Sequence, residues 1–551
     1  MGEDERTVHK PFIKKIGCAS LAALTLVAPA VLSGCASNSA ADDDIKAGDD
    51  LRLLPGITLD YENTFFDDFT GGVDSDNWYI GKQAWGANGN GGVVPENVNY
   101  TDDGVLVLTG NGEYYTSGAV KGVGARRDGT LAGAALISKS VYGAGRYEVK
   151  MKVLPRLGAC NAFWTFAYDN DTAANHEIDI ELPGGTHSTG IISYERMLNT
   201  NYHTESANQS QDTAIANNTN GVINNFADGE WHTFGFDWYT LESDEDEATQ
   251  FGRFSADEIT DEMAAQGVKA GDVKDTTCGR VVYFVDGKVT AVSNVFVPFL
   301  QTRMWLGLWF PNNAGFVGDA NFESDNMYVD WVRHTPFAGQ PIEEFTPQLT
   351  GDVATPDEYP SAPITLEKVN GVANGDFEYV RKEATNSGWE YYKRNMSTAE
   401  LAAIRKEIED AHPEALYDEI VAMYNAKRKE ITSADASTYC TVAEGIGGKG
   451  SCGLKVEKIG LVSQVIDSIF GGFELDVGFY ANGKGCVNVM FMGNGDDIVE
   501  QKRITVSTDE WKDFSQSLVA PEGTKRVEIE ITSEFDAPLY IDDISLVKVK
   551  Q

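Results

Sequence analysis

The sequence is poor in basic residues and in cysteine. Its 44 lysine and arginine residues stand against 84 acidic residues, which gives a formal net charge of −40. A chain with this charge repels nucleic-acid phosphates and lacks a basic patch to bind them, so we expect a neutral or cationic partner and no nucleic acid. The seven cysteines have no metal-ligand spacing. This argues against a zinc site but allows one disulfide in an exported protein.

Long apolar runs are also scarce, and the one that stands out lies near the N-terminus. It extends from Ile16 to Leu32, after three lysines, and ends in the sequence LSGC at Cys35. The run is short for a membrane span, and a polar SNSAADDD stretch follows it. Residues 1–35 resemble a bacterial lipoprotein signal with Cys35 as the lipidation site, and 36–56 read as a flexible tether. We therefore expect an exported cell-envelope protein held to the membrane by lipid; an uncleaved anchor is the alternative.

Strand patterns dominate the rest of the chain. Its 551 residues, of which 42% are hydrophobic, are enough for two or three cores. Segments such as GRYEVKMKVLP and WHTFGFDWYT alternate apolar and polar residues, which predicts an antiparallel β-sandwich at 57–337. A proline-rich acidic stretch at 338–366 predicts a semi-rigid linker. Residues 367–551 are again rich in strand patterns and predict a second β-sandwich, so the fold class is all-β.

Helical spacing interrupts the second strand-rich block. Ser397 and Glu400 form a capping box ahead of apolar residues at helical intervals. Pro413 is suited to open a second set of such residues. The pattern predicts a helical insertion at 397–432, whose apolar stripe must pack against some other surface.

Three acidic residues with no base between them lie in ANHEIDIELPGG, residues 174–185. Side chains of a strand alternate between its two faces, so Glu177, Asp179 and Glu181 share one face and three aliphatic residues share the other. The aliphatic face would enter the core, and the acids would line an outer face. A charged strand facing solvent is the simpler alternative, but the surrounding sequence favours a functional site.

The surrounding segments carry a family resemblance. EIDIE follows YGAGRYEVKMKVLP and AFWTF and precedes DGEWHTFGFDW, YFVDGK, MWLGLWFPN and VDWVRH. In this order and spacing they resemble glycoside hydrolase family 16 over nearly the whole first block. The resemblance implies a curved β-jelly roll that is an endo-acting, retaining hydrolase or transglycosylase of β-glucans or β-galactans. It also implies that no cofactor is required.

The resemblance also implies a role for each acid. Glu177 matches the nucleophile, Glu181 the general acid/base, and Asp179 the residue that hydrogen-bonds the nucleophile. The chemistry agrees, because retaining hydrolysis needs one ionised and one protonated carboxyl group about 5 to 5.5 Å apart. Crowding three acids raises at least one pKa, which keeps a proton available near neutral pH.

The substrate is less sharply indicated. No extra residue separates Asp179 from Glu181, which resembles lichenases and xyloglucan-active enzymes and favours mixed-linkage β-1,3-1,4-glucan. Lichenases tend to have Trp-Asp where this chain has Asn175 and His176. The alternatives are the same hydrolase acting on a β-galactan or host glycan, and a catalytically silent glycan-binding lipoprotein. We expect a monomer that meets a polysaccharide or oligosaccharide.

Aromatic residues are expected to bind sugar rings. Trp85 lies on a glycine-rich stretch, and Trp164 and Trp309 resemble cleft positions of the family, although a core position is equally compatible with the last two. His176 is a further substrate-binding candidate, with a structural role as the alternative. Four other tryptophans lie in strand patterns and are expected in the core: Trp231, Trp238, Trp305 and Trp331.

Two further resemblances concern ligands. NGDFE at 374–378, Trp389 and YIDDISL at 540–546 resemble the first and last strands of carbohydrate-binding modules of families 4 and 9. The helical insertion is foreign to that pattern, so glycan binding and a spacer role both stay open. Asp330 in VDWVRH matches a side chain near the structural calcium of family 16, which makes it the candidate metal ligand.

Overall fold

The computed structural model describes most of the chain beyond residue 44. The described residues are 45–85, 90–115, 120, 130–169, 174–184, 196–204, 207–214, 225–241, 253–272, 279–349, 351–359, 362–365, 368–378, 389–494 and 497–549. The predicted signal at 1–35, including Cys35, lies outside them. Among the described helices, none combines the length and the hydropathy that crossing a membrane requires.

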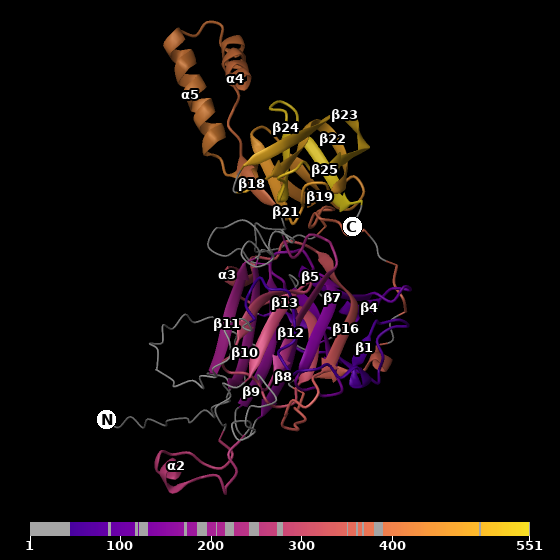
Figure 1. Ribbon diagram of the computed structural model, residues 1–551. Coiled ribbons are helices and arrows are strands. Elements are labelled where there is room, and N and C mark those ends of the chain that lie inside the picture. The colour runs from indigo at the N-terminus through magenta and orange to yellow at the C-terminus, as the bar shows by residue number, and fades with distance from the viewer. Residues whose placement is uncertain are drawn as a thin grey trace, which may run out of the picture.

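Two β-domains follow one another along the chain, and a pair of helices extends from the second (Figure 1). The predicted all-β class is confirmed. The first domain consists of two packed antiparallel sheets, here called the front sheet and the back sheet. The short helices α2 (Asp261–Ala265) and α3 (Ala314–Val317) lie in its connections.

The front sheet carries the acidic strand near its middle. Antiparallel pairing links its strands in an unbroken series. Their order is β17 (Val353–Ala354), β2 (Trp78–Gly81), β6 (Thr130–Ser138), β15 (Arg303–Trp309), β8 (Cys160–Asp169), β9 (Ala174–Pro183), β10 (Arg196–Thr204) and β11 (Ala207–Ala214).

The back sheet covers the inner face of the front sheet. Its strands also pair antiparallel. Their order is β4 (Val98–Tyr100), β5 (Leu106–Tyr115), β16 (Ser324–Pro336), β7 (Gly145–Lys152), β12 (His232–Tyr239), β13 (Arg280–Val285) and β14 (Lys288–Ser293). The short β1 (Phe65–Asp67) adds to β16, and β3 (Gly92–Val93) runs parallel to β6.

Alternating side chains of both sheets meet between them. Ile178 and Ile180 of β9 are fully buried there with Phe163 of β8 and Phe236 of β12. Trp238 shares this core and donates its indole N–H to the Pro298 carbonyl at 2.9 Å, as expected for a core tryptophan. The core thus fixes which face of β9 points outward.

The segment ahead of residue 57 differs from the predicted tether in its second half. Ile45 and Leu54 are buried against Val282, Val289 and other residues on the outer face of the back sheet. The described part of the tether is therefore a packed arm of the first domain. Apolar residues among the acids of this segment allow it to bury surface, which a free tether does not do.

The predicted linker at 338–366 is also packed rather than free. Gln340 accepts hydrogen bonds from the backbone N–H groups of Thr240 and Leu241 at 2.8 and 2.9 Å. Further on, β17 adds to the front sheet beside β2. The prolines predict a stiff chain, but the sequence pattern does not reveal the sheet edge on which this segment lies.

The second domain is a β-sandwich whose two longest strands belong to both sheets. β22 (Glu474–Met492) and β23 (Ile498–Val519) form one hairpin. The first part of β22 pairs with β25 (Leu539–Lys548), followed by β20 (Cys452–Val456) and β19 (Cys440–Glu444). Its second part pairs with β24 (Arg526–Ser533), followed by β21 (Gly460–Asp467) and β18 (Glu390–Lys393).

The crossing from one sheet to the other occurs at Gly483. Its φ is +106°, and a Cβ there would lie 2.1 Å from the carbonyl oxygen of Pro538, so only glycine fits. The cysteines Cys440, Cys452 and Cys486 of this domain, and Cys160 of the first, are all buried and free. No disulfide therefore joins cysteines within the described residues.

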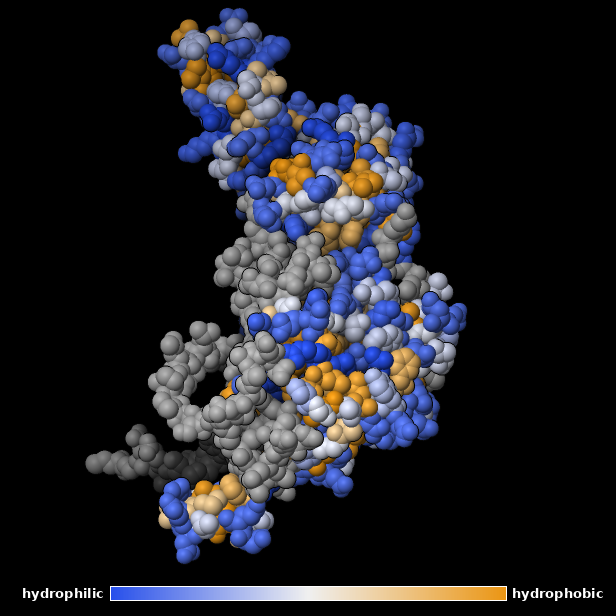
Figure 2. Space-filling model, in the orientation of Figure 1, coloured by the Kyte–Doolittle hydropathy of each residue, from blue (hydrophilic) through white to orange (hydrophobic). Residues whose placement is uncertain are grey.

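The helical insertion forms as predicted. Helix α4 (Thr398–Ala411) begins at the expected capping box, in which Ser397 accepts from the Glu400 N–H at 3.2 Å and Glu400 accepts from the Ser397 N–H at 2.6 Å. Helix α5 (Tyr417–Ser433) starts later than Pro413, which instead lies in the turn between the helices. The pair extends away from the sandwich, and its visible surface mixes hydrophilic and hydrophobic residues (Figures 1 and 2).

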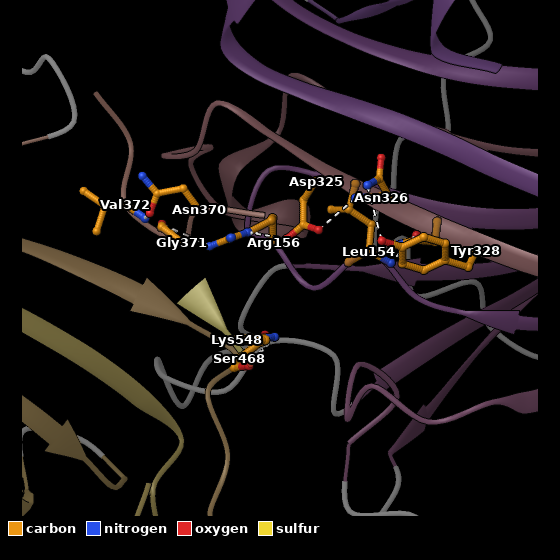
Figure 3. Close-up of polar contacts among 11 residues, drawn as sticks. Leu154, Arg156, Asp325, Asn326, Tyr328, Asn370, Gly371, Val372, Ser468 and Lys548 are labelled. Carbon is orange, nitrogen blue, oxygen red and sulfur yellow. Dashed lines mark hydrogen bonds and ion pairs between the residues drawn. The ribbon is translucent and has the colours of Figure 1, made fainter. Parts of the chain in front are cut away.

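A buried ion pair lies where the two domains meet. Arg156 binds Asp325 through its Nε at 2.8 Å, and its Nη1 donates to the carbonyl of Gly371 in the second domain at 3.4 Å (Figure 3). Lys548 faces the same pair; burial lowers its pKa to about 8, although Asp325 acts in the opposite direction. The backbone N–H of Asn374 donates to Glu323 at 2.8 Å. The domains are thus joined by direct contacts as well as by the chain.

We predict that Asp325→Ala destabilises the protein by about 3 kcal/mol, because it removes the carboxylate that binds the buried Arg156 guanidinium directly. The matched control is Asp330→Ala, whose Lys150 partner lies 2.7 Å away at a site about a third exposed. That exposed pair should contribute less than about 1 kcal/mol. Urea unfolding followed by tryptophan fluorescence, with EDTA present, measures both; equal losses would contradict the prediction.

Candidate active site

The acids lie on the outer face of the front sheet. Strand β9 keeps an unbroken register with β8 from Ala174 to Pro183, with no bulge between the acids. Glu181 lies opposite Ala162, Asp179 opposite Trp164, and Glu177 opposite Phe166. Cross-strand partners point to the same face, so the three acids and these neighbours form one surface.

Each glutamate has a different hydrogen-bonding neighbour. Asn175, two residues before Glu177 and on the same face, donates its amide to Glu177 Oε2 at 2.9 Å. Asp179 forms a second hydrogen bond with Glu177. Glu181 has the thiol of Cys160 3.8 Å from its Oε1. The sequence reasoning assigned no part to Asn175 and no chemistry to cysteine; the two-residue period of β9 would have placed Asn175 beside Glu177.

Burial raises the pKa of all three acids. It raises the pKa of Glu177 to about 7, while the hydrogen bonds from Asn175 and Asp179 act in the opposite direction. It also raises the pKa of Glu181 to about 7, and the charge of Glu177 adds to this. The pKa of Asp179 is raised well above its usual range by burial and by both glutamates.

The hydrogen-bonding partners, rather than the pKa directions, distinguish the three acids. Asp179 holds its proton and donates it in a hydrogen bond to Glu177, which favours the ionised form of Glu177. Glu181 has the weak thiol donor of Cys160 instead, and a charged Glu177 nearby favours its protonated form. These partners favour one carboxylate at Glu177 and one carboxylic acid at Glu181, which is the pair that glycosidic bond cleavage needs.

Four tryptophans cluster beside the acids on the same face. Trp164 stacks on Trp305 with ring centroids 5.3 Å apart, and Trp85 packs edge-on against both. Trp309 lies 6.2 Å from Trp85. Trp305 was expected in the core between the sheets, and the structure corrects this. It lies opposite Trp164 in β15 and so shares the outer face.

The remaining predicted residues lie elsewhere. His176 is fully buried on the opposite face of β9 from the acids, and its Nδ1 accepts from the N–H groups of Phe299 and Leu300 at 3.1 and 3.3 Å. The structure thus corrects its predicted sugar-binding role to a structural one. Trp231 and Trp331 are not in the core either, because each lies half-buried against cationic side chains of the back sheet.

No metal centre is formed by the described residues. Within them, no group of three or more histidine, cysteine, aspartate or glutamate residues is placed to hold an ion. The calcium candidate Asp330 sits at a break in the register of β16 and binds Lys150 at 2.7 Å. Glycoside hydrolysis by two carboxyl groups needs no metal, and calcium at Asp330 stays a prediction.

The raised pKa of Glu181 predicts a pH-dependent gain of stability in Glu181→Gln. A carboxyl group whose pKa is higher in the folded state than in the unfolded state contributes fully to the stability of the protein below its unfolded-state pKa. That contribution is lost as the pH rises through the folded-state pKa. The shift from 4.5 to about 7 corresponds to about 3 kcal/mol. Glu181→Gln should therefore equal the wild type near pH 4 and exceed it by up to about 3 kcal/mol at pH 8, measured by urea unfolding.

Glu400→Gln is the control of opposite sign. Burial alone would raise the pKa of Glu400, but hydrogen bonds and the charge of Arg394 lower it. Its replacement should reduce stability at pH 8. If both variants changed stability in the same direction with pH, burial of the Glu181 charge would not be the cause.

Solved structures of several hydrolases resemble this chain. A native glycosidic hydrolase is 17% identical with a TM-score of 0.35, and the match covers 53% of this chain and 100% of that one. A Bacillus licheniformis β-glucanase is 18% identical with a TM-score of 0.34, covering 50% and 99%. The laminarinase catalytic domain of Thermotoga maritima is 16% identical with a TM-score of 0.34, covering 51% and 98%. Sequence identities this low do not show which substrate this chain acts on.

A family model gives the firmer result. No curated protein matches the chain. Residues 94–243 match the model described as glycosyl hydrolases family 16. The matched range contains β9 and all three acids, together with Cys160 and Trp164. The matched part of the first domain is therefore similar to family 16 glycosyl hydrolases, and the chain is a glycoside hydrolase.

Proposed function

We propose that this protein is an endo-acting, retaining β-glucanase that works by double displacement. The observation that carries the proposal is the arrangement on β9, where three acids share one outer face and Asp179 hydrogen-bonds Glu177. The family 16 match at 94–243 supports hydrolysis of a glycan. A chain that only binds glycan gains nothing from three crowded acids whose charged forms are disfavoured by their surroundings, because crowding them costs stability.

In the first step, Glu177 attacks the anomeric carbon and forms a covalent glycosyl ester. The bond to the leaving oxygen breaks, and Glu181 gives its proton to that oxygen. The hydrogen bonds from Asn175 and Asp179 hold the Glu177 carboxylate in place and disperse its charge. Asp179 keeps its own proton throughout, so it acts as a positioning residue.

In the second step, Glu181 is ionised and acts as the base. It takes a proton from water, the water oxygen attacks the anomeric carbon, and the ester bond to Glu177 breaks. Two inversions at the same carbon restore the original configuration. The product is a sugar with a free hydroxyl of the β configuration, and both carboxyl groups return to their starting states.

For the substrate we propose mixed-linkage β-1,3-1,4-glucan. The support is the regular strand between Asp179 and Glu181, which lacks the extra residue that laminarinases and agarases of the family usually carry. Reducing-sugar release from barley β-glucan, xyloglucan, laminarin, agarose and mucin glycans tests this. Release from agarose or mucin alone would favour a β-galactan or host-glycan hydrolase. Binding without any release would identify a silent glycan-binding protein.

Azide rescue should distinguish the two glutamates. In Glu177→Ala, azide replaces the nucleophile in a single displacement, so the glycosyl azide has inverted configuration. In Glu181→Ala with an activated leaving group, azide attacks the glycosyl ester, so the azide product retains the configuration. The activity of both variants on glucan should fall by more than about 10³-fold. NMR of the first product of the wild type provides the check, and an inverted sugar would refute double displacement.

Lipid anchoring through Cys35 is a further proposal. Cys35→Ala should move the protein from the membrane fraction to the soluble fraction, because one lipidated residue would hold it there. Its activity on soluble glucan should stay unchanged. Retention of this variant in the membrane fraction after a high-salt wash would point to an uncleaved anchor instead.

We also propose that the second domain binds glycan. Its two signature segments lie together, since the Ile544 N–H of the closing strand donates to the Gly375 carbonyl at 2.9 Å. Trp389 is fully buried and donates its indole N–H to the Asn374 carbonyl at 3.2 Å. These residues hold the sandwich together, so any sugar must bind elsewhere on the domain.

Affinity electrophoresis tests this proposal. The full chain with Glu181→Gln should be retarded in gels that contain barley β-glucan more than the same chain ended after residue 366. A tethered second binding site raises the local concentration of polymer, so the difference should be larger for long polymer than for short oligosaccharide. Equal retardation, with both proteins shown to be folded, would leave the domain as a spacer or docking module.

A further inference from the structure

Residues 343–349 and 351–354, here called the strap, lie along the front sheet. At one end, the Glu343 N–H donates to the Phe299 carbonyl at 2.9 Å, and the Gln301 N–H donates to the Glu343 carbonyl at 3.0 Å. In the middle, Arg303 Nε donates to the Pro347 carbonyl at 3.4 Å. The strap is thus attached to the start of β15 rather than crossing solvent.

The other end of the strap is part of the sheet. Val353 pairs with Gly81 and Ala354 with Ile80, which makes β17 the edge strand beside β2. The Lys82 N–H donates to the Asp352 carbonyl at 3.0 Å. Backbone bonds therefore fix both ends of the strap.

Between these ends, the strap packs on the tryptophan cluster. Leu349 and Val353 contact the buried group formed by Ile137, Ala162, Trp164, Phe166 and Trp305. Tyr79, Trp85 and Tyr168 pack against the same group, and within it Trp164 is only 8% exposed and Trp305 only 4% exposed, although both lie on the outer face. Asp179 and Glu181 on the neighbouring strand share that face.

We propose that Leu349 and Val353 determine specificity by covering part of the group that contains Trp164 and Trp305. This inference rests on the proposed function. Tryptophan faces stack on the apolar faces of sugar rings, and the two rings lie on the β2 side of the acids. With the strap in place, the glucan gains little from further sugar units on that side. The strap thus sets how many units the enzyme recognises there.

The test measures binding in the Glu181→Gln background, so that cleavage does not intervene. β-1,3-1,4-Gluco-oligosaccharides of increasing length, from trimer to octamer, are titrated while tryptophan fluorescence is followed. With the strap intact, affinity should level off at a short length. With Leu349→Ala and Val353→Ala added, it should keep rising, to about tenfold above the parent for the longest oligosaccharide.

The control is Ile364→Ala in the same background. Ile364 lies further along the same segment, where its N–H donates to the Tyr100 carbonyl at 2.8 Å, and it is not part of the tryptophan cluster. It should leave the length profile unchanged. Acrylamide quenching and a melting curve show separately whether the strap variant is folded with its tryptophans more exposed.

Each outcome decides one question. If the folded strap variant has more exposed tryptophans but the parent length profile, the specificity proposal is wrong. Hydrolysis of the same oligosaccharides by the wild type tests the proposed function on its own. Length-dependent binding without hydrolysis would refute the β-glucanase and keep the strap proposal, and absence of both would refute both.

Discussion

The site depends on the two-residue period of one strand held between two neighbours. In β9 the same register that sends Ile178 and Ile180 into the core sends the three acids outward. Burial of the aliphatic face contributes roughly 1.5 to 3 kcal/mol for each large side chain. That free energy offsets the cost of withdrawing three carboxyl groups from water on the other face. Slipping the pairing with β8 by one residue would place the acids in the core, so the register and the chemistry are selected together.

The second constraint is electrostatic. A carboxyl group in this site is withdrawn from water by its neighbours, and the direction in which each pKa moves is common to all three acids. What separates their functions is the set of donors around them. Asn175 and Asp179 serve Glu177, whereas a weak thiol donor serves Glu181. The different roles proposed for Glu177 and Glu181 therefore depend on two short side chains of the same strand, Asn175 and Asp179, rather than on the glutamates themselves.

Much of the local structure could be predicted from the sequence because it depends on near neighbours. The alternation in β9 and the capping box at Ser397 and Glu400 involve residues two or three apart. Trp305 was misplaced because a tryptophan in a strand pattern does not reveal which sheet face lies outside. His176 was misplaced because its partners, Phe299 and Leu300, are more than 120 residues away. The packing of the predicted linker was missed for the same reason, because its partners are spread across the first domain and lie far from it in the sequence.

The hairpin of β22 and β23 has a consequence for how the second domain unfolds. Because β22 pairs with β25 before Gly483 and with β24 after it, and β23 follows it along its length, loss of this hairpin removes a strand from both sheets. The sandwich is therefore one cooperative unit rather than two separable layers. Amide protons in β19, at one end of the first sheet, and in β18, at one end of the second, are linked to the same opening event.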